Sequence, residues 1–586
     1  MNKNIWITAI ILIAGLTGCN YLDVTPPNVI TDDQVYSSES GVKAALTKLY
    51  IELPIEDIRF DNTGFGGDAY WGNLELFVGH ALNRKNDDTA PSGFSSNMGA
   101  GWWNYTAIRD INKFIFNIRK TTALSETTKK AYEAEALTLR AWCYFEMAKR
   151  YGGVPIVAGL LEYNGPQSIE SLQIPRAGEK ETWDFILNDV DSALIKGIPG
   201  DVTGRLGKYS ALTVKAQAAL FAASIAKYSD IRVTDPNTGK MVCGIDPSEA
   251  NNYYQIAYNA CDSVIESGKY ALARTLNSSD LSENFRLLFL KPDNHKEAIF
   301  TKYFSYPDLV YFFDNFTVPW SRQGQVSAAP TVDLLEEFEF LDGRPGTTGI
   351  PSVGGGYSQA FDNRTDFFAG RDARMAATIM IPGETFQSNL VDVKYGEIDA
   401  NGKEQTSSKY RGTYGMGADN QTPSSMFRKK HVDDSKVHSL TDADSNQPFI
   451  VLRYAEVLLM AAEAKVELGN PDAALPYIND IRTRAGLKGI NTVKLDEVRR
   501  QWDCEMAYEN RSLWNYRRWR IHDVLMSTPF TPRGLFPLLD TRSGKWVYLT
   551  NYIGNGNYIF QKRFYYNAID AGEIQKNPKL VQNYGY

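Results

Sequence analysis

Histidine and cysteine are scarce in this sequence, with five of each among 586 residues. The histidines show no close ligand spacing, and no Cys-x-x-Cys pair occurs. Both absences argue against a zinc ribbon and against a thioredoxin-like redox site. Four cysteines lie well inside the chain, where we expect buried free thiols and leave open a disulfide between the middle two: Cys143, Cys243, Cys261 and Cys504.

Motifs that carry enzymatic chemistry are also missing. The chain has no Gly-x-Ser-x-Gly, no His-Glu-x-x-His and no Walker loop, and GRLGKYS at 204–210 has the wrong glycine spacing for one. The segment 431–438, with two histidines and two aspartates, is interpreted as a solvated polar loop. The segment DADSN at 442–446 lacks the glycine and the closing glutamate of an EF-hand. The sequence therefore predicts neither a catalytic residue nor a metal site.

Charge of one sign is not concentrated anywhere along the chain. Lysine and arginine total 62 against 69 aspartates and glutamates, which gives a net charge of −7 at pH 7. A slightly acidic chain without basic blocks argues against nucleic acid as a partner. Long apolar runs are absent except at 5–16, which is shorter than the ~20 residues that span a bilayer.

The amino terminus is typical of an exported lipoprotein. Lys3 precedes the apolar stretch 5–16, whose length suits the core of a secretory signal peptide. The following segment LTGC, which ends at Cys19, resembles the bacterial lipobox. We therefore expect residues 1–18 to be a signal peptide and Cys19 to be the lipidated first residue of the mature chain. Two or three acyl chains would anchor it stably.

Helical periodicity is the main pattern that is present. Between 453 and 485, apolar residues recur at helical spacing on both sides of a turn at Gly469, Asn470 and Pro471. A pair of helices of about 34 residues is the tetratricopeptide design. Further helices are expected at 105–120, 129–150, 181–196, 208–228, 251–267, 495–508 and 510–525. From 285 to 450 Gly, Pro, Asp and Asn are frequent, which predicts ordered loops and short strands on this helical scaffold.

Several of these segments together resemble one family. YTAIRDIN at 105–112, AEALTLRAWCYFEMAKRYGGVPIV at 134–157 and RYAEVLLMAAEA at 453–464 are similar to motifs of the SusD/RagB family of Bacteroidetes outer-membrane nutrient-binding lipoproteins. The resemblance implies a mainly α, tetratricopeptide-like helical superhelix with a loop-rich, irregular ligand-binding region. It divides the mature chain into an N-terminal helical region at 19–230 and a C-terminal region at 231–586. The latter contains the loop-rich insert 285–450 and the helices at 450–526.

The final helices depart from the family pattern at three positions. Gln501, Asn510 and Asn515 stand where the family usually has Glu, Gly and Asp. Other residues of the pattern are kept, and we expect them to form buried charge pairs between helices: Glu505, Glu509, Arg518 and Trp519.

The resemblance also implies a function. Such proteins face the cell exterior on the outer membrane, where they cap a SusC-like TonB-dependent transporter. They capture an oligosaccharide and deliver it without cleaving it. No cofactor is needed, although some members hold a structural calcium ion. A peptide-binding nutrient receptor of the RagB type and, further off, a surface glycoside hydrolase are the alternatives.

Aromatic residues in loops are the candidate binding residues. Sugar rings stack their C–H faces on flat aromatic side chains, and their hydroxyls need polar partners. Tryptophans at helical spacing are expected in the core: Trp142, Trp183, Trp502, Trp514 and Trp519. Tryptophans that lie among Gly, Pro and Asn are predicted to bind glycan, and the resemblance suggests neighbouring residues as well. The candidates are Trp71, Trp102, Trp103, Asn104, Trp320, Tyr303 and Arg322.

Overall fold

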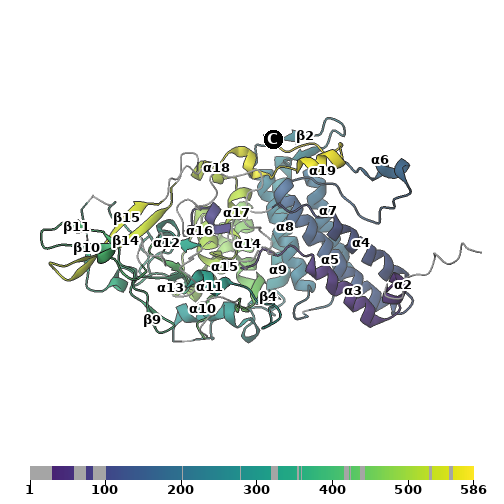
Figure 1. Ribbon diagram of the computed structural model, residues 1–586. Helices are drawn as coiled ribbons and strands as arrows, with labels where there is room; N and C mark the ends of the chain where they lie inside the picture. Colours follow the sequence, from purple (N-terminus) through teal and green to yellow (C-terminus); the bar gives the residue numbers. More distant parts are fainter. Residues whose placement is uncertain are drawn as a thin grey trace, which may run out of the picture.

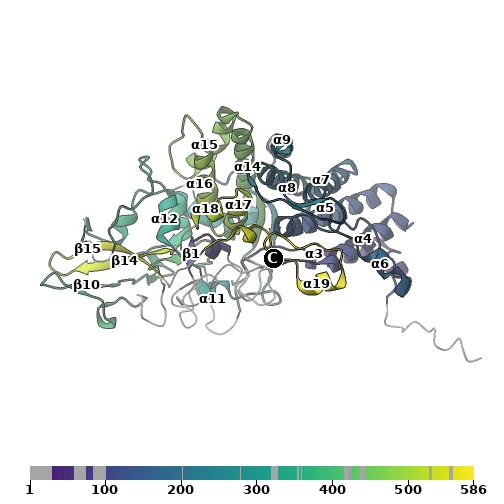
Figure 2. The same ribbon diagram turned by 90° about the horizontal axis from the view of Figure 1, so that it is seen from above.

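The computed structural model describes residues 30–58, 74–82, 101–200, 202–277, 279–318, 328–352, 356–357, 359–414, 422, 424–435, 443–526, 531–553 and 559–586. Helices of the first half of the chain form one side of the molecule, and strands β10, β11, β14 and β15 lie at the far end (Figure 1). Helices α14 to α17 lie between these two parts, as the view from above also shows (Figure 2).

Consecutive long helices pack side by side in the first half. α4 contacts α5, α5 contacts α7, α7 contacts α8, α8 contacts α9, and α9 contacts α14. The bounds of the array are α3 (Glu39–Ile51), α4 (Tyr105–Lys120), α5 (Glu126–Tyr151), α7 (Glu179–Ile195), α8 (Lys208–Tyr228), α9 (Ala250–Ile265) and α14 (Tyr454–Glu467). This arrangement confirms the predicted mainly α, tetratricopeptide-like fold.

The remaining helices are shorter. They are α2 (Asp32–Val35), α6 (Ile169–Leu172), α10 (Leu281–Leu290), α11 (Phe313–Thr317), α12 (Val332–Glu337), α13 (Ala373–Thr378), α15 (Leu475–Arg484), α16 (Leu495–Met506), α17 (Ser512–Arg518), α18 (His522–Leu525) and α19 (Ala571–Lys576). Single 3₁₀ turns include η1 (Leu74–Phe77), η4 (Pro292–Asn294) and η8 (Pro471–Ala474).

Sequence explains why the array packs closely. α8 is rich in alanine and is buried on all its faces, so that neighbouring helices approach it from several sides. α4 instead buries one stripe, with Ile108, Ile111 and Ile115 at helical spacing. Its first turn is capped by Asn104, whose side chain accepts a hydrogen bond from the Ala107 amide at 3.0 Å.

Strands gather in the second half. A five-stranded sheet has the order β11–β10–β14–β15–β6, in which β14 and β15 form an antiparallel hairpin and β10 runs parallel to β14. Its strands are β6 (Ala360–Phe361), β10 (Gly396–Ile398), β11 (Glu404–Gln405), β14 (Arg533–Asp540) and β15 (Lys545–Tyr552). β4 (Ala298–Lys302) pairs with β13 (Phe449–Arg453), and β1 (Ala81–Leu82) pairs with β5 (Ala329–Pro330). Shorter strands are β2 (Val233–Thr234), β3 (Met241–Cys243), β7 (Ile379–Met380), β8 (Thr385–Phe386), β9 (Asn389–Leu390) and β12 (Phe427–Arg428).

Two helix predictions need correction. Gly469 does adopt a left-handed conformation with φ of +78°, but residues 471–474 form a 3₁₀ turn and the second helix of the pair begins at Leu475. The single helix expected at 510–525 is two helices, α17 and α18, because Arg520 between them has φ of +55°. A residue in that region cannot continue a right-handed helix.

Buried ion pairs join the C-terminal helices, as predicted. Glu505 on α16 accepts hydrogen bonds from Arg453 at 2.6 Å and Arg374 at 3.0 Å, and also from Arg484. Glu509 accepts from Arg453 at 2.7 Å. Arg518 donates to Glu463, with Nη2 to Oε2 at 2.7 Å.

The four internal cysteines are buried free thiols. This confirms the first expectation and excludes the Cys243–Cys261 disulfide. Among the helices described, none combines the length and the apolar character that a membrane crossing requires.

The carboxyl-terminal tail, residues 566–586, returns to the amino-terminal helical array (Figure 1), where the carbonyl of Lys576 at the end of α19 accepts a hydrogen bond from Gln173 at 2.9 Å. Arg176 donates a hydrogen bond to the Val581 carbonyl at 2.7 Å. Asn583 donates to the Tyr151 carbonyl at 3.1 Å and accepts from the Cys243 thiol at 2.9 Å. The tail is thus part of the packed structure.

Candidate functional site

The structure describes some of the predicted site residues and not others. Cys19, Trp71, Trp320 and Arg322 lie outside the described residues. Trp102, Trp103 and Asn104 precede α4, and Tyr303 follows β4.

The three residues before α4 are occupied with packing. Trp102 is buried, with 9% of its surface exposed. The half-buried ring of Trp103 makes edge contacts with Tyr105 and Tyr151, at centroid distances of 5.4 Å and 5.1 Å. Asn104 caps α4 and also donates a hydrogen bond to Glu52 at 3.3 Å. Asn104 thus starts the helix, and the two tryptophans before it pack against the rest of the protein.

Tyr303 displays its ring to solvent, since 37% of the residue is exposed. Its hydroxyl donates a hydrogen bond to Asp293 Oδ1 at 2.5 Å, which holds the ring in place. Partial burial and the hydrogen bond to Asp293 raise the pKa of Tyr303 to about 12, so the phenol is neutral under physiological conditions. The residue is therefore a neutral aromatic platform with a fixed orientation.

Tyr303 lines a surface pocket of about 270 Å³, which we call the Tyr303 pocket. This volume lies near the lower end of the ~300–1,000 Å³ typical of small-molecule sites. Its walls come from the loop 202–205 before α8, the segment 269–270 after α9, the turn 292–296 and strand β4. Its lining contains both polar and apolar residues, which include Arg205, Lys269, Asp293, Lys296 and Thr301 together with Val202, Tyr270, Ile299 and Phe300.

His295 also lines the pocket, but both of its ring nitrogens already have partners. Nε2 lies 3.0 Å from the Leu288 carbonyl oxygen, and Nδ1 accepts a hydrogen bond from the Glu297 amide at 3.0 Å. The imidazole therefore fixes the shape of the turn 292–296.

Next to the pocket, residues 303–311 form a small hairpin that sequence reasoning missed. Ser305 and Leu309 exchange backbone hydrogen bonds of 3.1 Å and 2.7 Å. Tyr306 at its tip is 65% exposed and Leu309 is 46% exposed. The tyrosines of the run KYFSYP were the available sequence signal for this hairpin. No local pattern, however, distinguishes a displayed tyrosine from a packed one.

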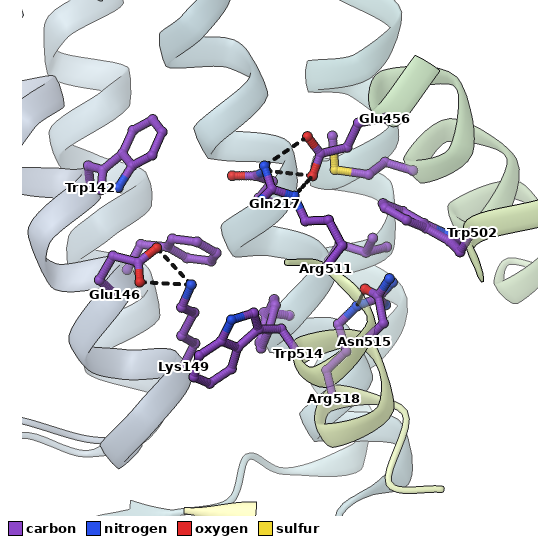
Figure 3. A pocket seen from close by; sticks show the side chains of 14 residues that line it. Trp142, Glu146, Lys149, Gln217, Glu456, Trp502, Arg511, Trp514, Asn515 and Arg518 are labelled. Carbon is purple, nitrogen blue, oxygen red and sulfur yellow. Dashed lines mark hydrogen bonds and ion pairs between the residues drawn. The ribbon is translucent and has the colours of Figure 1, made fainter. Parts of the chain in front are cut away.

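A second cavity lies inside the protein, between α5, α8, α14, α16 and α17 (Figure 3). Its volume is about 40 Å³, which is enough for water but not for a sugar ring. Its polar lining is paired: Gln217 donates to Glu456 at 2.7 Å, and Lys149 donates to Glu146 at 2.8 Å. Tryptophans 142, 502 and 514 line it, so the prediction that these belong to the core is confirmed.

The segment 431–438 was wrongly interpreted as solvated at its start, because His431 is buried with 1% exposure. Burial and the nearby cations Arg428 and Lys430 hold the pKa of His431 well below its usual value. Its Nδ1 lies 3.0 Å from Arg428 Nη2, so the neutral ring accepts a hydrogen bond there. Within the described part of the chain, no group of three acidic, histidine or cysteine side chains is placed to hold a metal ion.

Comparison with known proteins gives consistent matches over most of the chain. A family model described as "SusD family" matches residues 294–586, and one described as "Starch-binding associating with outer membrane" matches residues 20–222. SusD-like protein P38 of Formosa agariphila is 24% identical over 511 residues, covering 85% of each chain.

Solved structures share the fold. A SusD-like protein of Bacteroides fragilis superposes with a TM-score of 0.70 at 23% identity, covering 95% of this chain and 99% of that one. A SusD-like carbohydrate-binding protein of the same species gives a TM-score of 0.67 at 19% identity, covering 93% and 100%.

Proposed function

Because the chain belongs to the SusD family, we propose that it is a glycan-binding protein of the outer membrane that captures its ligand without cleaving it. The observation that carries this proposal is the match of residues 20–222 to a model described as starch-binding and associating with the outer membrane. The carbohydrate-binding description of a structural relative supports it.

Binding is proposed to use the Tyr303 pocket. A sugar ring stacks on the exposed face of Tyr303, and its hydroxyls exchange hydrogen bonds with Asp293, Lys296 and Thr301. Since the bond to Asp293 already orients the tyrosine ring, little side-chain entropy is lost on binding. The loop residues predicted from sequence remain proposed contributors: Trp71, Trp102, Trp103, Asn104, Trp320 and Arg322.

Lipidation of Cys19 is proposed to hold the protein on the outer face of the membrane. From there it delivers the glycan to a SusC-like TonB-dependent transporter. Protease treatment of intact cells tests this orientation, because an inward-facing protein would be fully protected.

Glycan binding is tested by affinity electrophoresis of the purified protein in gels that contain different polysaccharides. For a retarding polysaccharide, Tyr303→Ala is expected to reduce affinity about 3- to 10-fold, the equivalent of roughly 0.7–1.4 kcal/mol of lost stacking. Tyr552→Ala is the matched control, because Tyr552 is 65% exposed on β15 and does not line the pocket.

Three results would contradict the proposal. Retardation by no polysaccharide, together with tryptophan fluorescence changes on adding peptides, would favour a peptide receptor. Shortened polysaccharide products in chromatography would show an enzyme. Equal affinity of Tyr303→Ala and the wild type would remove the pocket from the binding site.

A further inference from the structure

The hairpin 303–311 beside the Tyr303 pocket displays a group of apolar side chains. Tyr303, Tyr306 and Leu309 are 37%, 65% and 46% exposed, and all three lie within the span 303–309. Single exposed apolar side chains are common on protein surfaces and need no explanation. Several of them on one short element next to a pocket are instead a sign of an interaction surface.

Buried residues fix the base of this hairpin. Phe304 and Tyr311 are 9% and 1% exposed, and their ring centres lie 4.7 Å apart. The Tyr311 hydroxyl donates to the Gln447 carbonyl at 2.6 Å. Tyr311 and Ser445 also exchange backbone hydrogen bonds of 2.9 Å and 3.0 Å. The backbone that carries Tyr306 is therefore held in place by the protein itself, so a ligand need not pay for ordering it.

The two exposed tyrosines lie close to each other along the chain. Successive side chains of an extended segment point to opposite faces, which is why Phe304 turns inward and Tyr303 outward. Tyr306 follows Tyr303 by three residues, so their Cα atoms are at most about 11 Å apart. Adjacent sugar rings share a single glycosidic oxygen. A glycan with one ring on Tyr303 therefore has its next ring within reach of the hairpin.

The pocket and the hairpin complement each other in size and in chemistry. The pocket volume of about 270 Å³ is small for a ligand site, so the pocket takes one sugar ring and leaves the adjoining units outside. A second sugar needs polar partners besides an aromatic face. The exposed Asp308 carboxylate and Ser305 hydroxyl, on either side of Tyr306 in the sequence, offer such groups.

We propose that the site takes two consecutive sugar units, one in the Tyr303 pocket and the next on the exposed ring of Tyr306. Tyr306 is a second stacking platform, and Asp308 accepts hydrogen bonds from hydroxyls of the outer unit. The site consequently prefers glycan chains to single sugars. This inference rests on the proposed function, because it names the length of the ligand that the same site recognises.

The test measures how affinity depends on the length of the glycan. A polysaccharide that retards the protein in affinity electrophoresis is partly hydrolysed with acid, and fragments of one to four units are separated by size. Each fragment then competes with the intact polysaccharide, and the concentration that halves the retardation is recorded. Two-unit fragments are expected to compete about 10-fold better than the single sugar.

Variants assign this gain to a residue. Tyr306→Ala is expected to weaken fragments of two or more units about 3- to 10-fold and to leave the single sugar unchanged. Tyr306→Phe keeps the ring and is expected to bind like the wild type. Tyr303→Ala, in contrast, is expected to weaken fragments of every length. Tyr163→Ala is the control, because Tyr163 is 63% exposed, much like Tyr306, and does not line the pocket.

The outcomes separate the two proposals. If Tyr306→Ala leaves all fragments unchanged while Tyr303→Ala weakens them, or if two units compete no better than one, the second platform is wrong and the glycan-binding function stands. Equal losses in Tyr306→Phe and Tyr306→Ala would show that the ring is not the contact. If Tyr306→Ala weakens the single sugar as much as longer fragments, its assignment to the outer unit is wrong. If no polysaccharide retards the wild type, both proposals are wrong.

Discussion

Two buried histidines, His80 and His522, help to hold the short segment 74–82 in place, and they differ in protonation state. His80 lies 3.1 Å from Glu75 and 3.4 Å from the Tyr516 hydroxyl. Burial alone would lower its pKa, but the hydrogen bond to Glu75 and the charge of Asp503 raise the pKa of His80 to about 9. His522 donates to the Phe77 carbonyl at 2.8 Å, and burial lowers the pKa of His522 to about 3. At neutral pH the first is an imidazolium and the second is a neutral ring.

Stability should therefore fall on the alkaline side because of His80. Its pKa is raised on folding, so its contribution is complete below the unfolded value of 6.5 and is lost as pH rises through about 9. The lost contribution is on the order of 3 kcal/mol. Urea denaturation between these pH values is expected to show a smaller loss in His80→Gln than in the wild type.

The neighbouring acids act in the same direction. Burial raises the pKa of Asp503 and of Glu337, so each acid releases its proton at a higher pH in the folded state than in the unfolded state. His522→Gln is the control, because a histidine that is already neutral cannot contribute an alkaline loss. An equal alkaline loss in His80→Gln and the wild type would contradict this assignment.

The contributions of the Tyr303 ring and of its hydroxyl to glycan affinity can be separated by substitution. Tyr303→Phe keeps the stacking surface and loses the hydrogen bonds of the hydroxyl, including the one to Asp293. We expect glycan affinity to fall less than 3-fold in Tyr303→Phe, compared with about 3- to 10-fold in Tyr303→Ala. Calorimetric titration measures both, and equal losses would mean that the oriented hydroxyl matters more than the ring.

At the scale of elements, the turn between α16 and α17 joins distant parts of the chain. Asn510 there has φ of +58°, where the family usually has glycine. Its side chain accepts from the Leu74 amide at 3.1 Å and donates to the Glu56 carbonyl at 3.1 Å. The departure noted in the sequence thus adds hydrogen bonds that a glycine cannot make.

Asn510→Gly is expected to destabilise the protein by about 1–3 kcal/mol, because it leaves buried backbone groups without partners. The backbone conformation itself is easier for glycine, which offsets part of the loss. Chemical denaturation measures the difference. A variant as stable as the wild type would show that these hydrogen bonds contribute nothing net.

Helix α16 also carries the central carboxylate of the buried ion-pair network. Arg374, Arg453 and Arg484 all donate to Glu505. Glu505→Gln removes the counter-charge that these buried cations share, although each keeps another carboxylate: Asp372 for Arg374, Glu297 and Glu509 for Arg453, and Glu297 for Arg484. A loss of about 3 kcal/mol is expected.

A surface pair supplies the comparison. Asp362 and Lys545 lie 3.2 Å apart with both side chains largely exposed, so Asp362→Asn should cost at most ~1 kcal/mol. If the two variants have the same denaturation midpoint, the buried network contributes no more to stability than the surface pair does.

The β14–β15 hairpin is an element that sequence reasoning did not find. Pro537 lies in the middle of β14 and, having no amide hydrogen, argues locally against a strand. It is tolerated because its carbonyl, rather than an amide, pairs with Tyr395 at 2.8 Å. Residues on one face, including Phe536 and Val547, are buried in a small core that only the folded chain reveals.

At the scale of the whole molecule, the helices could be predicted from the sequence, but the sites where distant segments come together could not. The helices at 105–120 and 208–228 match their expected bounds, because apolar spacing and end residues are local signals. The Tyr303 pocket instead combines the segments 202–205, 269–270 and 292–303, which no local pattern connects. The sequence therefore pointed to Tyr303 as a displayed aromatic but not to Arg205 or Lys269.

The docked carboxyl-terminal tail has a consequence for the order of folding. Val581, which accepts the hydrogen bond from Arg176, lies 405 positions further along the chain. Contacts between such distant positions form late, because a long loop must close before they contribute. Because residues 566–586 are synthesised after the helices that they contact, we expect the helical array to complete its packing only once this tail has docked.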